Sequence, residues 1–550
     1  MPALCRQQRR VTSMEMHLVT FLFAMLFATS TEASYPLKIL GLFPHPGVSH
    51  FHFFHPILRG LAEVGHEVTV VSHFPDKSPP VRYRDLPLTG RETLTDSVDL
   101  KIFENRHFYN HFVEFFLLYE WGKEACNHTL KSNALAQVLR EKTSYDVILM
   151  EQFNTDCMMG VAHLLKAPVI ALSSCALMPW HYERIGNPII PSYIPALFLG
   201  QSGDMDFFGR LANWITFHSF NLMYKFISVP AADALVQYKF GHDMPSVGEL
   251  VKETALFFVN QHFSLSGAKP LSPAVIELGG IHIQKAKPLS VELQKFLDNA
   301  DHGVVFISWG SMIRADSLPE SKRDAIIKAM KRLKQRVIWK WENETLPNKP
   351  DNMIISKWLP QRDILCHPNV KVFMTHAGLM GSSEAAYCGV PVLATPMYGD
   401  QFLNAAALKQ RGMGTILNYE EITENAILRA VKNMLEKQLV TSLPYSSNFH
   451  FIFFLMYLRY RDNAQAVSHS FRHRPHTAMQ TAIWWVEYVA RSEGAPLLKS
   501  SAVPMSRFVY YSLDVYLLIG AIVVIYVCSC IWIFKTFCSR SVEVIKIKKN

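Results

Sequence analysis

The sequence predicts an α/β fold built from two Rossmann-like domains, followed by a C-terminal transmembrane helix. Short β-branched runs that lead into helical segments begin at Leu37 and again at Val304, a pattern typical of parallel sheets covered by helices. A proline-marked linker at residues 270–288 separates the two sets. Near the C-terminus, Val515–Phe534 is an uncharged, mostly apolar stretch that is long enough to span a bilayer.

Bulk composition agrees with this organisation and excludes some classes of protein. A chain of 550 residues has room for two core-bearing domains. Of the net charge of +9, residues 1–33 contribute +1 and residues 535–550 contribute +4. Too little positive charge remains elsewhere for a nucleic-acid-binding protein. The nine cysteines show no zinc-binding spacing, and the odd number between residues 34 and 509 allows one disulfide that the sequence cannot pair.

The two termini predict a secretory route and a membrane anchor. Residues 1–33 contain a basic start, the apolar run Leu18–Ala28 and a small-residue cleavage site, which together predict a signal peptide. With a transmembrane helix at residues 510–534, the protein would be a single-pass type I protein whose basic tail, residues 535–550, is cytosolic. The final K-I-K-K-N resembles a dilysine retrieval signal. We therefore expect an endoplasmic reticulum membrane protein with its two domains in the lumen, where the acceptor triplets at Asn127 and Asn343 would be glycosylated.

The first domain is predicted at residues 34–279. A strand at Leu37–Phe43, the turn P-H-P-G-V-S-H, a helix and the strand G-H-E-V-T-V-V-S open a Rossmann-like unit that lacks the G-x-G-x-x-G of dinucleotide sites. His50 begins the helix above the sheet, where the near-neutral pKa of an imidazole suits a general base. From spacing alone, His45, His50, His52 and His55 could instead form a metal cluster or a loop without a role.

Two segments of the first domain are dense in aromatic residues, 103–121 and 178–220, and prolines interrupt the second. Such segments suit an apolar acceptor pocket or a membrane-facing surface equally well, and both alternatives stay open. The D-x-D at Asp204–Asp206 imitates a metal-binding motif. Because it lies far from any predicted strand end, we interpret it as a chance match.

The second domain is predicted at residues 280–475. Its first strand, Val304–Ser308, ends in a turn of small residues, Ser308, Gly310 and Ser311, where a ligand could approach the backbone closely. A helix at Glu320–Leu333 and strands at Arg336–Lys340 and near Ile354 follow. Residues 440–459 include an aggregation-prone apolar run that is too short to span a bilayer. Our hypothesis is that this segment is an insertion from a retained intron or a faulty gene model, and the alternative that stays open is a genuine extra hydrophobic helix.

The stretch from Trp358 to Gln401 carries most of the predicted site. Strands at Val370–Met374 and Val390–Thr395 each end in a turn that leads into a helix, Ser382–Tyr387 or Phe402–Gln410. In such sheets ligands bind at the carboxyl ends of the strands. Backbone N–H groups at Gly381–Ser383 would cradle a diphosphate, Glu384 could bridge two vicinal hydroxyls, and Trp358 offers a flat face for a base. The polar and small residues at these strand ends are His376, Gly378, Gly381, Ser382, Glu384, Asp400 and Gln401.

The sequence motifs in this stretch, W-L-P-Q followed by H-A-G and then D-Q, resemble the donor-binding signature of UDP-glycosyltransferases. The chain from about Tyr35 onwards, apart from residues 440–459, resembles the membrane-bound animal enzymes, and W-K-W-E at Trp339–Glu342 is closest to the insect ones. The resemblance implies a glycosyltransferase B-type fold with an acceptor domain, a donor domain and, within residues 476–509, a helix that crosses back onto the first domain.

The resemblance also implies roles for individual residues. His50 would be the general base, and a carboxylate would orient it. Glu151 stands where the family places its aspartate, whereas Asp156 has the family's residue type if the loop is one residue longer; we slightly favour Asp156. Trp358 would stack on uracil, with Gln361 on the nucleoside and Glu384 on the ribose. His376 and the turns at Ser308–Ser311 and Gly378–Ser382 would meet the phosphates, and Asp400 and Gln401 the sugar.

The expected activity is therefore the inverting transfer of a hexose from a UDP-sugar to small lipophilic acceptors, as in detoxifying conjugation. The UDP-sugar, which we expect to be UDP-glucose, is a co-substrate, and neither a metal nor another cofactor is expected. A homo-oligomer stays open. Two rival interpretations are a catalytically silent relative that binds ligands or partners, and a receptor-like two-lobed binding protein.

Overall fold

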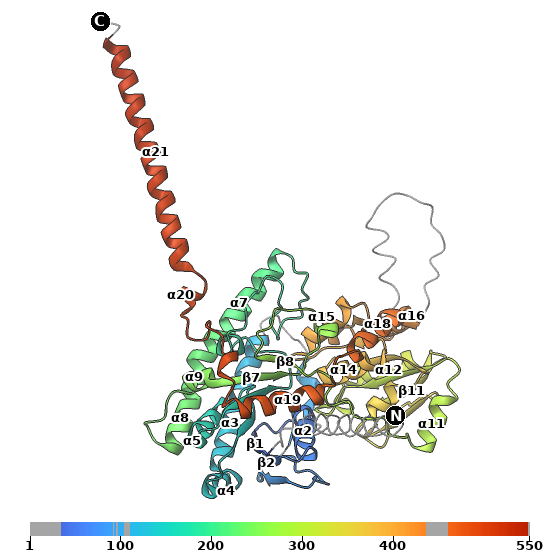
Figure 1. Cartoon of the computed structure of the whole chain (residues 1–550). Coiled ribbons are helices and arrows are strands. Elements are labelled where there is room, and N and C mark those ends of the chain that lie inside the picture. The colour runs from blue at the N-terminus through green and yellow to red at the C-terminus, as the bar shows by residue number, and fades with distance from the viewer. Residues whose placement is uncertain (1–34, 92, 95–96, 104–109, 436–459, 548–550) are drawn as a thin grey trace, which may run out of the picture.

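The computed structural model describes residues 35–91, 93–94, 97–103, 110–435 and 460–547. The predicted signal peptide and the predicted insertion at residues 440–459 lie outside these residues. Two parallel sheets, each flanked by helices, form the body of the protein (Figure 1).

The first sheet has the strand order β3-β2-β1-β5-β6-β7-β8 and is parallel throughout. The inner strands are apolar on both faces because helices cover both sides. Its strands are β1 Lys38–Phe43, β2 Glu67–Ser72, β3 Tyr83–Pro87, β5 Val147–Glu151, β6 Val169–Ser173, β7 Thr254–Val259 and β8 Val275–Glu277. The helices around it are α2 Val48–Glu63, α3 Asn110–Lys131, α4 Asn133–Glu141, α5 Met159–Leu165, α6 His181–Arg184, α7 Phe207–Met223, α8 Val229–Phe240, α9 Val247–Leu250 and α10 Phe263–Ser266.

The second sheet has the order β12-β11-β9-β13-β14-β15 and is also parallel. The strands predicted at Val304–Ser308 and Arg336–Lys340 are found as β9 and β11 with those bounds. The other strands are β12 Met353–Ser356, β13 Val370–Thr375, β14 Val392–Ala394 and β15 Gly414–Ile416. The helices are α11 Val291–Asp298, α12 Glu320–Lys331, α13 Gln361–Leu365, α14 Leu379–Cys388, α15 Gln401–Gln410 and α16 Glu424–Leu435.

A short segment of the first half of the chain belongs structurally to the second sheet's domain. Strand β4, Val98–Asp99, pairs in parallel with β10, Ile313–Arg314. Leu100 and Phe103, directly after β4, are buried in the core formed by the second domain. The Tyr419 hydroxyl donates to the Leu100 carbonyl at 3.1 Å. This connection could not be predicted, because a two-residue strand carries no periodicity.

The chain returns to the first domain near its end. Helix α18, Tyr460–Arg472, packs on α14, and α19, Ala478–Arg491, then packs on α2. Ala482, Val486 and Val489 of α19 are fully buried in the core of the first domain. A capping box between Thr477 and Gln480 fixes the start of α19.

The last helices are α20, Arg507–Tyr510, and α21, Leu513–Ile547. Within α21, Leu513–Cys538 is long and apolar enough to cross a membrane, and none of its most apolar window is buried in the protein. Figure 1 shows α21 projecting alone from the body.

The described residues form two disulfides, whereas the sequence analysis allowed for one. Cys126 pairs with Cys157, and Cys366 pairs with Cys388. Cys175 is the buried cysteine that remains free. The partners are far apart in sequence and only the fold brings them together.

Candidate functional site

A cleft of about 550 Å³ lies where the carboxyl ends of the two sheets face each other. Both halves of the chain contribute to its wall, and ligand sites are common at such interfaces between domains and at the carboxyl ends of parallel strands. The predicted site residues that line it are His50, Ser308, Gly310, Ser311, Trp358, Gln361, His376, Gly378, Gly381, Glu384, Asp400 and Gln401.

On the first-domain side, His50 is held by Glu151. His50 is the third residue of α2 and Glu151 is the last residue of β5, and their Nδ1 and Oε1 atoms are 2.5 Å apart. Glu151 is fully buried. Phe153 packs edge-on against the His50 ring at 4.9 Å between centroids. Because Glu151 occupies Nδ1, the Nε2 atom of His50 is left for a ligand.

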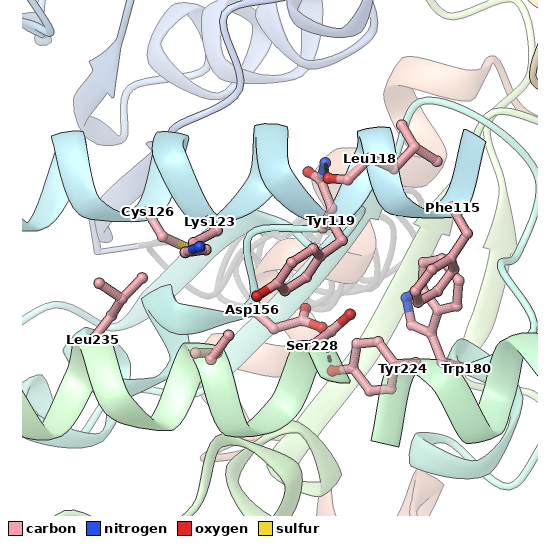
Figure 2. A pocket seen from close by; sticks show the side chains of 13 residues that line it. Phe115, Leu118, Tyr119, Lys123, Cys126, Asp156, Trp180, Tyr224, Ser228 and Leu235 are labelled. Carbon is pink, nitrogen blue, oxygen red and sulfur yellow. Dashed lines mark hydrogen bonds between the residues drawn. The ribbon is translucent and has the colours of Figure 1, made fainter. Parts of the chain in front are cut away.

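Asp156 does not contact His50, so our preference for Asp156 as the partner is wrong. Its carboxylate accepts hydrogen bonds from Arg184 at 3.1 and 3.0 Å and from the Tyr224 hydroxyl at 2.5 Å. Figure 2 shows Asp156 beside Tyr224 in a separate small cavity, between α3 and α8. The turn after Glu151 carries the chain away from the cleft, which makes Asp156 part of a buried ion pair.

The alternative of a four-histidine metal cluster is also not supported by the geometry. His55 pairs with Asp76 at 2.9 Å, away from His50. The atoms of His45, His50 and Glu151 do lie within 4.8 Å of one another. However, the two imidazoles are stacked, with centroids 4.3 Å apart and planes only 10° from parallel. Lone pairs lie in the ring planes, so parallel stacked rings do not converge on one ion.

On the second-domain side, two glycines make room for His376. A Cβ atom at Gly310 would lie 2.8 Å from the His376 ring, and Gly310 has a φ of +77°. A Cβ atom at Gly378 would lie 2.4 Å from Nε2 of the same ring. Burial lowers the pKa of His376 to about 4, and the nearby Lys340 contributes to this shift. His376 is therefore a neutral imidazole at physiological pH.

The helix after β13 begins earlier than the sequence predicted. Gly378 is its N-cap and Leu379 its first residue, whereas we predicted a start at Ser382. The Ser382 N–H already donates to the Gly378 carbonyl at 3.0 Å, and Ser382 is fully buried outside the cleft lining. The N–H groups that can meet an anion are therefore those of Leu379, Met380 and Gly381.

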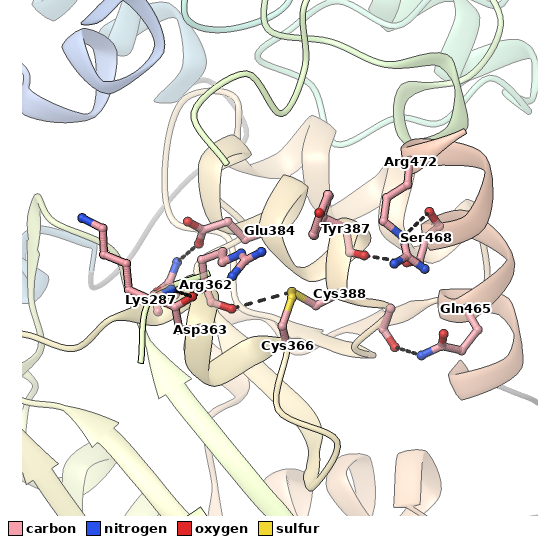
Figure 3. Close-up of a disulfide and its surroundings, with 12 residues drawn as sticks. Lys287, Arg362, Asp363, Cys366, Glu384, Tyr387, Cys388, Gln465, Ser468 and Arg472 are labelled. Carbon is pink, nitrogen blue, oxygen red and sulfur yellow. Dashed lines mark hydrogen bonds and ion pairs between the residues drawn. A yellow bond between two sulfur atoms is a disulfide. The ribbon is translucent and has the colours of Figure 1, made fainter. Parts of the chain in front are cut away.

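Glu384 and Gln361 form a buried polar pair on adjacent helices. The Gln361 amide donates to Glu384 Oε2 at 2.7 Å. Burial raises the pKa of Glu384 to about 7, although this hydrogen bond opposes the shift. The Cys366–Cys388 disulfide ties the end of α13 to the end of α14, the helices that carry these two residues (Figure 3). Trp358 lies next to them and is 62% exposed.

Asp400 and Gln401 lie at the start of α15. Asp400 accepts a hydrogen bond from Asn404 at 2.9 Å, and burial raises its pKa. The Gln401 side-chain carbonyl accepts from the Met397 N–H at 2.9 Å, which fixes the turn before the helix.

Cys175 and His282 are among the residues of the cleft wall that the sequence analysis did not predict. Both ring nitrogens of His282 are buried without a hydrogen-bond partner among the described residues, and burial lowers its pKa to about 4. Burial also raises the pKa of the Cys175 thiol. Neither residue belongs to a motif, so no local signal could have identified it.

Comparisons with known proteins agree with this architecture. The family model described as UDP-glucoronosyl and UDP-glucosyl transferase matches residues 42–448 and 454–550. UDP-glycosyltransferase UGT5 of Dactylopius coccus is 34% identical over 92% of this chain and 94% of its own length. UDP-glucuronosyltransferase 1A3 of Rattus norvegicus is 30% identical over 71% of this chain and 69% of its own length.

Solved structures support the fold. A UDP-glucose: anthocyanidin 3-O-glucosyltransferase in complex with UDP aligns with a TM-score of 0.52 at 16% identity, covering 83% of this chain and 99% of that one. Its similarity extends over both sheets, as expected for a glycosyltransferase B-type fold. The chain is a glycosyltransferase that uses a UDP-sugar, and it belongs to the UDP-glucuronosyl and UDP-glucosyl transferase family.

Proposed function

We propose that this enzyme transfers glucose from UDP-glucose to hydroxyl groups of small lipophilic acceptors, in a single inverting displacement. The observation that carries the proposal is the His50–Glu151 pair, which faces the donor half of the same cleft. A relative named UDP-glucosyltransferase 2, from Dactylopius coccus, is 33% identical over 97% of this chain and 99% of its own length. This supports glucose over glucuronate as the donor sugar.

In the proposed reaction, Nε2 of His50 takes the proton of the acceptor hydroxyl as its oxygen attacks the anomeric carbon. The bond from that carbon to the diphosphate breaks, and UDP leaves with the electron pair. Glu151 fixes the tautomer of His50 and stabilises the imidazolium that forms. The first N–H groups of α14 meet the charge that develops on the diphosphate, so the step requires no metal or other cofactor.

The proposal keeps the donor roles that the family resemblance implies, and the common position of these residues in the wall of the cleft supports it. Trp358 stacks on uracil and Gln361 contacts the nucleoside, while the Glu384 carboxylate accepts hydrogen bonds from the ribose hydroxyls. Neutral His376 lies beside the diphosphate turn formed with Gly310 and Gly378. Asp400 and Gln401 bind the hexose hydroxyls.

An apolar cluster beside His50 supports a lipophilic acceptor. Phe153, which packs against His50, belongs to a buried group with Cys175, Met178 and Trp180. A flat apolar acceptor that contacts this group would remove its own apolar surface from water, which favours binding. Phenols are therefore the first acceptors to test.

We further propose that α21 anchors the enzyme in the endoplasmic reticulum membrane, with the cleft in the lumen and the K-I-K-K-N tail in the cytosol. The length and apolar character of α21 support the anchor. Protease treatment of sealed microsomes tests the orientation: it should remove an epitope at the C-terminus and leave the remaining chain intact.

The catalytic proposal is tested by UDP release with UDP-glucose or UDP-glucuronate and a panel of phenols. We expect His50→Ala and Glu151→Gln to lower kcat by about 10²–10⁴-fold, the range for a positioned general base, while UDP-glucose binding survives. Near-normal turnover by His50→Ala would refute the assignment. UDP-glucose binding without turnover by the unaltered enzyme would favour a catalytically silent relative.

A further inference from the structure

The turn that carries Asp400 is held partly by the first domain. The Gly399 N–H donates to Oε2 of Glu114 at 3.0 Å, and Glu114 is a residue of α3 in the first domain. Gly399 has a φ of +61°, a left-handed conformation that favours glycine. Asp400 follows directly and is the N-cap of α15. A carboxylate of the first domain therefore fixes the backbone one residue before a side chain with a proposed role in sugar binding.

The contact between Glu114 and this turn is electrostatically favourable. Its acceptor is a carboxylate, and charge-assisted hydrogen bonds are roughly twice as strong as neutral ones. Glu114 also lies beside the N-terminus of α15, where the aligned peptide dipoles favour negative charge. Burial raises the pKa of Tyr398, and the charges of Asp400 and Glu114 raise it further, so both carboxylates lie near its hydroxyl.

The second domain supplies the other supports of the turn. The Gln401 side-chain carbonyl accepts from the Tyr398 N–H at 3.3 Å, and Asn404 donates to the Asp400 carboxylate at 2.9 Å. These contacts hold the two ends of the turn. The bond from the Gly399 N–H to the first domain holds its middle, so the turn takes its full set of contacts only when both domains are in place.

The start of α15 also packs against the acceptor side of the cleft. Leu403 of α15 is buried in an apolar group that contains Phe115, the residue after Glu114. Phe153, which packs against His50, belongs to the same group. Glu114 therefore lies where the apolar group, the proposed base and the turn before α15 come together.

We infer that Glu114 is a positioning residue for the hexose of the donor, and that it acts through the Gly399–Asp400 turn. Without this carboxylate the Gly399 N–H would lose its partner and the turn could rotate, so Asp400 would meet the hexose hydroxyls less often. UDP ends at the diphosphate and has no hexose to place against this turn. Loss of Glu114 should therefore weaken the binding of UDP-glucose and leave the binding of UDP unchanged. This inference rests on the proposed role of Asp400 in hexose binding.

The test compares the Kd for UDP-glucose with the Kd for UDP, by isothermal titration of the full chain in detergent micelles. We expect Glu114→Ala to raise the Kd for UDP-glucose about five- to tenfold, the typical net worth of one hydrogen bond, with an unchanged Kd for UDP. Glu114→Gln keeps a side-chain carbonyl that can accept from the Gly399 N–H, so it should bind both ligands like the unaltered enzyme. Glu120→Ala, which removes an exposed carboxylate from the same helix, should change neither Kd.

The variant Asp400→Ala separates this inference from the proposed hexose site. It should raise the Kd for UDP-glucose by itself, and Glu114→Ala/Asp400→Ala should bind no more weakly, because Glu114 acts through Asp400. A normal Kd for UDP-glucose in Asp400→Ala would overturn the proposed hexose site and this inference with it. Weak binding by Asp400→Ala together with normal binding by Glu114→Ala would overturn this inference alone. Weaker binding of UDP by Glu114→Ala, or additive losses in the double variant, would show a general structural role and would also overturn it.

Discussion

The raised pKa of Glu384 predicts that donor affinity depends on pH. In the proposed role, Glu384 accepts hydrogen bonds from the ribose hydroxyls of the donor, so its carboxylate form should be the form that binds. With a pKa of about 7 in the free enzyme, the factor 1 + 10^(pKa − pH) is about 1.1 at pH 8 and about 11 at pH 6. The Kd for UDP-glucose should therefore rise about tenfold from pH 8 to pH 6, which corresponds to about 1.4 kcal/mol.

Isothermal titration with UDP-glucose at pH 6, 7 and 8 measures this dependence directly. UDP-glucose is the suitable ligand because its esterified diphosphate does not titrate in this range. His376, with a pKa of about 4, also stays neutral throughout. Glu384→Gln should bind weakly at every pH and with no pH dependence. A constant Kd for the unaltered enzyme, or a pH-dependent Kd for the variant, would refute the reasoning.

Three further predictions concern residues outside the His50–Glu151 pair. Asp156→Asn should lower the free energy of unfolding by about 3–5 kcal/mol because it leaves a buried guanidinium unpaired; thermal denaturation measures this, and a loss of turnover without a loss of stability would contradict it. Cys388→Ser should raise the Kd for UDP-glucose several-fold, and dithiothreitol should do the same to the unaltered enzyme but not to the variant. Of the two glycosylation triplets, Asn343 is exposed, whereas Thr129 of the Asn127 triplet is fully buried in α3. Endoglycosidase digestion should therefore reveal one glycan, which Asn343→Gln loses and Asn127→Gln keeps.

Much of the fold could be predicted from the sequence because its strands are buried on both faces. Short apolar runs rich in β-branched residues, such as Val304–Ser308, favour a central parallel strand. The strand ends then fix where His50, His376 and Asp400 must lie. The fold therefore brings together most of the predicted cleft from positions far apart in the chain.

The errors arose where the path of a loop decides the contact. Sequence spacing could not tell whether Glu151 or Asp156 meets His50, because the four residues between them turn the chain away from the cleft. The start of α14 was missed because its N-cap, Gly378, makes no side-chain capping bond and thus lacks the usual polar signal. The Asp204–Asp206 motif serves the fold: Asp206 caps α7 by accepting from the Gly209 N–H at 2.7 Å.

The segment that begins with β4 limits how this protein can be divided or recombined. Leu100 and Phe103 fill the core of the donor-binding half, although they precede it by about two hundred residues in the chain. A donor-half fragment that starts near residue 280 would lack them, and losing a buried leucine alone costs about 2–5 kcal/mol. Chimeras that exchange acceptor specificity between relatives should therefore keep residues 98–103 from the same parent as the donor half.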